Sequence, residues 1–257
     1  MLLTGASRGI GRALARKLAG LGAKLILAAR SERELVELGA ELSAQGAEFL
    51  LKPADVGDRN AVKGLVEAGG ERFGRLDVLV NNAGVGLRAR IPEIRPDDFG
   101  TAWAVNVLGP LLLIQAVWPW FERQGGGLII NICSLGALQP APNIGGYSAT
   151  KAALAALGAA ARLELAPFGV RVCNVFPGSA ATSFRAHALG ETYPENEPRL
   201  SRVSPELVAE RILVGAARGE RDIFITWPDR ALATLSRLAP ALADRLVVRA
   251  FRRVQGR

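Results

Sequence analysis

Short runs of aliphatic and β-branched residues alternate with longer amphipathic stretches along almost the whole chain. Strands that are apolar on both faces are typical of a parallel sheet with helices on each side. The alternation therefore predicts an α/β fold, a three-layer doubly wound parallel sheet. The strand-like runs are 24–29, 48–52, 76–81, 128–133, 171–176 and 222–226, and the helical stretches are 10–21, 32–44, 58–73, 97–123, 147–166 and 205–218.

The length of the chain suits one domain of this kind. It has 257 residues, of which 49% are hydrophobic, so it can bury a large core, and we expect a single domain over residues 1–257. Only residues 1–4 remain for the first strand, which is therefore either truncated or a stub. The long loop-like tract that follows residue 177 predicts a substrate lid over about 179–205.

The positive charge of the chain gathers at its C-terminal end. Residues 230–257 hold seven arginines and one acid, Asp244, so this segment carries +6 of the net +8. No basic face interleaved with aromatic residues accompanies it, and we expect no nucleic acid partner. We predict a basic helical extension over about 229–257.

Two interpretations of this extension stay open. Leu242, Leu246, Val247 and Phe251 could form an apolar stripe beside the arginines, as in a helix that lies on a membrane surface. The alternative, which we favour, is a helix packed over the substrate mouth with its arginines extended into water.

Cysteine usage and the chain start indicate a cytoplasmic protein. Cys133 and Cys173 lie in apolar runs, so we expect small buried hydrophobic residues and no disulfide. Met1 leads directly into LLTGASRG without the charged and apolar regions of a secretory signal. The longest apolar stretch, 107–121, is shorter than the ~20 residues that span a bilayer. No metal site is predicted.

A glycine-rich turn, TGASRGIG at residues 4–11, lies where the first strand meets the first helix. Glycines allow the backbone to approach a pyrophosphate, and the helix N-terminus offers free N–H donors and a positive dipole end. The turn therefore predicts a dinucleotide site. The residues expected to contact the cofactor here are Gly5, Ser7, Arg8, Gly9, Ile10 and Gly11.

The end of the second strand indicates which dinucleotide binds. An acidic residue at that position bonds the adenosine ribose in NAD sites, whereas a cation accommodates the 2′-phosphate in NADP sites. Here Ala29 is followed by Arg30, and Arg8 of the glycine turn offers a second guanidinium. We predict NADP (NADPH) in preference to NAD.

A possible catalytic group comes from two later segments. Tyr147 and Lys151 are four residues apart at the start of a helix and so project from one face. Ser134 follows an apolar strand, at the end of the sheet where ligands bind. The Lys151 ammonium favours the phenolate, Tyr147 can exchange a proton with a carbonyl or alcohol oxygen, and Ser134 can hydrogen-bond that oxygen.

Together these motifs resemble the classical short-chain dehydrogenase/reductase (SDR) family over almost the whole chain. Their order and spacing carry the likeness. The matching residues are TGASRGIG at 4–11, Asp55-Val56, Asn81-Asn82-Ala83-Gly84, Asn106, Ser134, Tyr147-Ser-Ala-Thr-Lys151, and Pro177-Gly178 with Thr182.

The resemblance implies a Rossmann-type sheet of about seven strands and a role for each matching residue. Asn106 would hold a water that connects Lys151 to solvent, Lys151 would also bond the nicotinamide ribose, and Asn81 would tie strands together. The remaining cofactor contacts would be Asp55 and Val56 at the adenine, Asn82, Ala83 and Gly84 in the groove, and Pro177, Gly178, Ala180 and Thr182 at the nicotinamide.

These expectations lead to one principal hypothesis and one alternative. The principal hypothesis is an NADP(H)-dependent oxidoreductase that interconverts a ketone or aldehyde and an alcohol. The alternative is a non-catalytic NADP-binding sensor or scaffold of the same fold, which would have no need of the Tyr147 and Lys151 pair. The resemblance also implies a homodimer or homotetramer, and the extension is similar to that of subfamilies with bulky or lipid-like carbonyl substrates.

Overall fold

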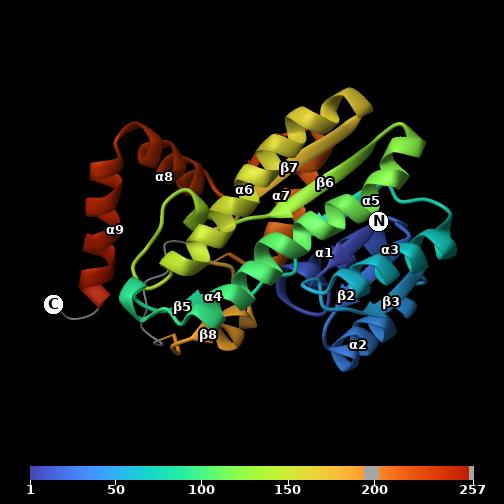
Figure 1. The fold of residues 1–257 in the computed structure, drawn as a ribbon, viewed down its shortest axis with the longest axis horizontal. Helices are drawn as coiled ribbons and strands as arrows, with labels where there is room; N and C mark the ends of the chain where they lie inside the picture. Colours follow the sequence, from blue (N-terminus) through green and yellow to red (C-terminus); the bar gives the residue numbers. More distant parts are fainter. Residues whose placement is uncertain (194–202, 255–257) are drawn as a thin grey trace.

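A computed structural model describes residues 1–193 and 203–254, and its centre is a parallel sheet of seven strands (Figure 1). The part of the predicted lid at 194–202 lies outside the described residues. The strand order is β3-β2-β1-β4-β6-β7-β9, so the chain reverses direction across the sheet between β1 and β4. The strands are β1 (Leu2–Thr4), β2 (Leu25–Ala29), β3 (Phe49–Pro53), β4 (Val78–Asn81), β6 (Gly127–Ile132), β7 (Val170–Phe176) and β9 (Asp222–Phe224).

The short first strand lies at the middle of this sheet. Leu2 pairs with Ile26 of β2 on one side and with Leu79 of β4 on the other, and its side chain is fully buried. Three residues are enough here because both neighbouring strands supply hydrogen bonds and both faces are covered by helices. The first strand therefore has three residues in the structure.

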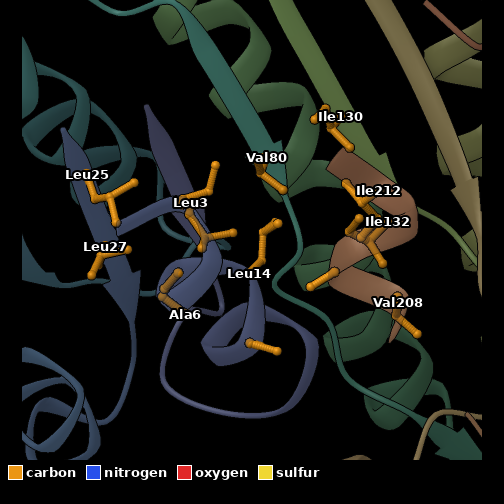
Figure 2. Close-up of a cluster of buried hydrophobic side chains, with 14 of the residues drawn as sticks. Leu3, Ala6, Leu14, Leu25, Leu27, Val80, Ile130, Ile132, Val208 and Ile212 are labelled. Atoms are coloured by element: carbon orange, nitrogen blue, oxygen red, sulfur yellow. The ribbon is translucent and has the colours of Figure 1, made fainter. Parts of the chain in front are cut away.

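Two layers of helices cover the sheet, as the alternation predicted. In the first layer, Leu14 of α1 and Val208 and Ile212 of α7 point toward side chains of the sheet such as Leu3 and Ile130 (Figure 2). A second buried cluster joins the other face to α3 and α5. The helices of the two layers are α1 (Gly9–Gly20), α2 (Glu32–Ser43), α3 (Arg59–Phe73), α4 (Pro96–Trp103), α5 (Gly109–Gln124), α6 (Gly145–Leu165) and α7 (Pro205–Ala217).

The helix expected over 97–123 is interrupted by a π turn. Residues Ala104–Leu108 form this turn between α4 and α5, and it contains Asn106. The combined helix has 29 residues and a mean hydropathy of 1.5, so by length and composition it is long and apolar enough to cross a membrane. The apolar stretch 107–121, taken alone, was too short to indicate this. Half of that apolar window is buried, and the helix packs against α3 and the sheet as a core helix does.

The edge of the domain carries a small sheet that was not predicted and the helical extension that the sequence predicted. The two-residue strands β5 (Leu87–Arg88) and β8 (Leu189–Gly190) pair in parallel and join the first part of the predicted lid to the body. The C-terminal extension consists of two helices, α8 (Trp227–Leu238) and α9 (Pro240–Val254), which stand at one end of the molecule away from the sheet (Figure 1).

The four residues of the apolar stripe that the membrane interpretation would need do not share one face of α9. Val247 and Phe251 are buried at 3% and 8% exposure, whereas Leu242 and Leu246 are 47% and 49% exposed. In an α-helix neighbouring residues lie about 100° apart, so 246 and 247 belong to different faces. One face of α9 packs against the protein and the other faces outward.

Candidate active site

A groove of about 350 Å³ crosses the carboxyl ends of the central strands. Its position, at the reversal of strand order, is where open α/β sheets bind ligands. Gly11 and Asn106 are the two predicted site residues that do not line it. Those that do are Gly5, Ser7, Arg8, Gly9, Ile10, Arg30, Asp55, Val56, Asn82, Ala83, Gly84, Ser134, Tyr147, Lys151, Pro177, Gly178, Ala180 and Thr182.

The glycine-rich turn forms a cradle at one end of the groove. Gly5 and Gly9 have φ angles of +62° and +55°, a conformation that side chains rarely adopt. Arg8 caps α1 by its backbone alone, and no described side chain bonds the free N–H groups of this helix. An open backbone and unpaired donors at a helix N-terminus fit the pyrophosphate of a dinucleotide.

Gly11 lies in the first turn of α1, directly against the glycine-rich turn. A Cβ at this position would lie 2.1 Å from the Gly5 carbonyl oxygen and 2.6 Å from Nδ2 of Asn82. The absence of a side chain therefore allows α1 to pack closely on the turn. This role is the one that the third glycine of a dinucleotide fingerprint serves.

Asparagine side chains hold the floor of the groove in place. Asn82 donates from Nδ2 to the carbonyl oxygens of Thr4 and Gly5, at 2.9 and 3.0 Å, and so fixes the end of β4 to the glycine turn. Asn81 donates to Asn131 at 2.9 Å, and Asn131 donates to Asn174 at 3.1 Å. Asn81 thus ties β4 to β6, in agreement with the role that the resemblance implied.

Arg30 follows β2 and Arg8 lies in the glycine-rich turn, and both line the groove. Arg30 is exposed, lines the groove and forms no ion pair with a described residue. Arg8 pairs through Nε with Glu34 at 3.2 Å and contacts Nε2 of His187 at 2.6 Å. Ser7 also donates to Glu34, at 2.8 Å. The sequence patterns gave no indication of Glu34, which forms an ion pair with Arg8.

The three catalytic candidates converge at the opposite end of the groove. Ser134 follows β6, while Tyr147 and Lys151 project from the first turns of α6. The Ser134 hydroxyl lies near enough to the Tyr147 phenol to influence its pKa. Lys151 Nζ lies 6.0 Å from the centre of the Tyr147 ring and donates to the Ile132 carbonyl oxygen at 2.8 Å. A carbonyl oxygen placed beside Ser134 would therefore also face the phenol.

Burial governs the acid–base properties of this group. It raises the pKa of Tyr147 above its ordinary value, and the neighbouring Ser134 hydroxyl offsets part of this rise. It lowers the pKa of Lys151 to about 8. The expectation that the lysine would lower the pKa of Tyr147 is therefore not met, because loss of hydration dominates the shift.

Asn106 lies behind the groove and is fully buried in the π turn. Its Oδ1 accepts from the Val85 amide at 2.9 Å, and its Nδ2 donates to the Val85 carbonyl and the Thr150 hydroxyl. Both amide hydrogens are thus used within the protein. A Cβ on Gly84 would lie 3.2 Å from Asn106 Oδ1 and 3.3 Å from Lys151 Nζ, so both side chains lie beside Gly84.

Residues beyond the predicted set line the end of the groove near Tyr147. Phe184 lies 5.7 Å from the Tyr147 ring, and Phe251 reaches the groove from α9. Gln139 also lines it and anchors the extension, because it accepts from Ser236 at 2.7 Å and donates to Asp244 at 3.1 Å. These residues come from distant segments and carry no shared motif, so sequence patterns gave no signal for them.

Neither cysteine is placed to act as a nucleophile. Both are free and buried, and burial raises the pKa of Cys133 to about 12. Within residues 1–193 and 203–254, no group of three histidine, cysteine or acidic side chains is arranged to hold a metal ion.

Comparison with known proteins places the chain in a family. Residues 1–191 match the family model for short chain dehydrogenases. The uncharacterized oxidoreductase YxnA of Bacillus subtilis is 34% identical over 255 residues, which cover 96% of this chain and 70% of that protein. The chain therefore belongs to the short-chain dehydrogenase/reductase family and is an oxidoreductase of that family.

Solved structures agree with this assignment. A short-chain dehydrogenase/reductase from Burkholderia phymatum in complex with NAD has a TM-score of 0.85 at 28% identity, over 94% of this chain and 93% of that one. An alcohol dehydrogenase from Thermococcus sibiricus complexed with 5-hydroxy-NADP has a TM-score of 0.77 at 32% identity, over 87% and 94%. The similar structures thus include proteins with either dinucleotide.

Proposed function

We propose that this protein is an NADP(H)-dependent oxidoreductase that interconverts a ketone or aldehyde and an alcohol. The observation that carries the proposal is the single groove with a pyrophosphate cradle at one end and the hydroxyl groups of Ser134 and Tyr147 beside Lys151 at the other. A non-catalytic sensor of the same fold would need only the pyrophosphate cradle.

Tyr147, Ser134 and Lys151 can each perform one role in the reduction of a carbonyl group. Bound NADPH would supply the hydride. Tyr147 holds a proton at neutral pH because burial raises the pKa of its phenol, so it can donate to the substrate oxygen. Ser134 bonds that oxygen and stabilises its developing charge, and Lys151 balances the charge left on the tyrosine.

We expect tighter binding of NADPH than of NADH. Arg30 has no competing ion pair among the described residues, and Ala29 offers no carboxylate to a ribose. A guanidinium binds a phosphate through two hydrogen bonds. Dissociation constants measured by quenching of tryptophan fluorescence would compare the two cofactors, and Arg30→Ala should weaken NADPH binding about tenfold while leaving NADH binding unchanged. Tighter binding of NADH by the unaltered protein would contradict the proposal.

The substrate end of the groove favours bulky, apolar carbonyl compounds. Aromatic rings of Phe184, Tyr193 and Phe251 line it. We expect NADPH oxidation with aryl or long-chain ketones and aldehydes and much slower oxidation with acetone, which leaves these rings unburied. A panel of carbonyl compounds assayed by absorbance of NADPH tests this. Tight NADPH binding without turnover of any compound would instead support the sensor.

We also expect self-association, as a homodimer or homotetramer, through the outer faces of α4, α5 and α6. Large apolar side chains are exposed on these helices and on the turns that adjoin them: Trp103 at 42%, Leu108 at 37%, Leu163 at 78% and Phe168 at 47%. Exposed apolar side chains gathered on neighbouring helices mark interaction surfaces. Light scattering at micromolar concentration measures the mass, and a monomer would contradict the prediction.

A further inference from the structure

The outer face of α8 combines apolar side chains with arginines. Trp227 and Leu238 are each 80% exposed, at the two ends of the helix, and Ala231 and Thr234 between them also face outward. Arg230 and Arg237 lie along one flank of this row, because they are three and ten residues after Trp227. The inner face is closed by Ala233 and the buried cap residue Asp229.

Helix α9 continues the same kind of surface after the turn at Ala239. Leu242 and Leu246 are about half exposed, and Arg245 and Arg249 are exposed beside them. We call these eight residues the outer surface of the extension: Trp227, Arg230, Arg237, Leu238, Leu242, Arg245, Leu246 and Arg249.

Gln139 fixes the position of this surface. Its bonds to Ser236 and Asp244 join α8 and α9 to the loop after Ser134. Val247 and Phe251 bury the opposite side of α9. Both helices therefore have an inner face with a partner and an outer face that no described part of the chain covers.

The charge of the outer surface determines which kind of partner it can bind. Asp244 is the one acid in residues 230–257, and its carboxylate already accepts a hydrogen bond from Gln139. A second copy docked face to face would bring arginines against arginines, which is unfavourable. The partner must be anionic, and it must also accept an exposed tryptophan and three leucines.

An anionic lipid bilayer meets both requirements. Tryptophan and leucine insert at the boundary between headgroups and acyl chains, and neighbouring arginines bind anionic headgroups. We propose that the outer surface of α8 and α9 docks on an anionic membrane as a peripheral contact, without spanning it.

Vesicle flotation with the purified full chain tests this proposal. We expect binding to an equal mixture of phosphatidylcholine and phosphatidylglycerol, little binding to phosphatidylcholine alone, and a decrease with added salt. Trp227→Ser with Leu238→Ser should lower the partition coefficient at least tenfold. Arg230→Gln with Arg237→Gln should lower it to a similar extent.

A matched control separates this surface from net charge. Arg59→Gln with Arg218→Gln removes the same charge from exposed positions on α3 and just after α7. It should leave vesicle binding nearly unchanged. NADPH binding should be unchanged in every variant, because none of the substituted residues lines the groove.

Three results would overturn the proposal. The first is the absence of binding to the anionic vesicles, and the second is equal loss in the Arg59/Arg218 control. The third is a decrease in the mass of the protein in solution when Trp227 and Leu238 are replaced, because that result would assign the surface to contacts between copies of the chain. None of these results depends on turnover, so the proposed oxidoreductase function is tested separately.

Discussion

Tyr147→Phe should abolish turnover and leave NADPH binding nearly intact. The change removes one hydroxyl, which is the proton donor beside Ser134, while the ring still packs 5.7 Å from Phe184. General acid catalysis typically contributes about 10²- to 10⁴-fold, so we expect a rate loss of at least about a hundredfold. The rate of NADPH oxidation with an active carbonyl compound and the dissociation constant of NADPH are the two measurements.

The chain supplies a matched control for this substitution. Its other tyrosine, Tyr193, also lines the groove, and Tyr193→Phe removes the same hydroxyl group from a different position. That variant should keep most of its rate. If Tyr147→Phe retains more than a tenth of the rate, a loss of about 1.4 kcal/mol or less in barrier, general acid catalysis by Tyr147 is wrong.

The regular part of the fold could be predicted because its signals are local. Each strand of the main sheet corresponds to an apolar run, and its ends differ from the predicted ones by at most two residues. The paired strands β5 and β8 were not predicted, because two residues are too few to show a periodic hydrophobic pattern. The π turn at Asn106 was missed for a related reason, since one inserted residue hardly disturbs an apolar helical pattern.

The site divides in the same way between local and distant contributions. The glycine turn, the Tyr147 and Lys151 pair and the residues after β4 are short segments, so their spacing was visible in the sequence. Gln139, Phe184 and Phe251 meet only after folding, because the last of them comes from a helix more than a hundred residues after the first. The partners of Arg8 are of this kind too, since Glu34 and His187 reach it from different elements.

The acid–base state of Lys151 shows why residue type alone was insufficient. Lys151 is 3% exposed and its ammonium bonds one carbonyl oxygen, that of Ile132, so it loses hydration without gaining a described carboxylate partner. The pKa therefore falls to about 8, and little of its effect reaches the phenol of Tyr147. Burial sets the direction of both pKa shifts, upward for Tyr147 and downward for Lys151. It depends on how the whole chain packs, which a sequence motif does not specify.

Lys151→Met should remove turnover and at the same time change how stability depends on pH. In the unfolded chain this lysine titrates near 10.5, and in the folded chain near 8. Below pH 8 both states bind the proton, and the cost of burying the ammonium is fully present. Between pH 8 and 10.5 the unfolded state binds more protons, so the contribution of this group to the free energy of unfolding rises with pH.

This linkage gives a measurement that does not depend on a known substrate. The shift corresponds to about 3 kcal/mol in order of magnitude, so the unaltered protein should gain stability relative to Lys151→Met as pH rises from 8 to 10.5. Urea unfolding of both proteins across that range measures the difference, and Lys63→Met, which replaces an exposed lysine, should show no such trend. A constant difference between the unaltered protein and Lys151→Met would mean that the buried amine keeps an ordinary pKa. Its role beside Tyr147 would then be that of a permanent cation at every pH at which the enzyme works.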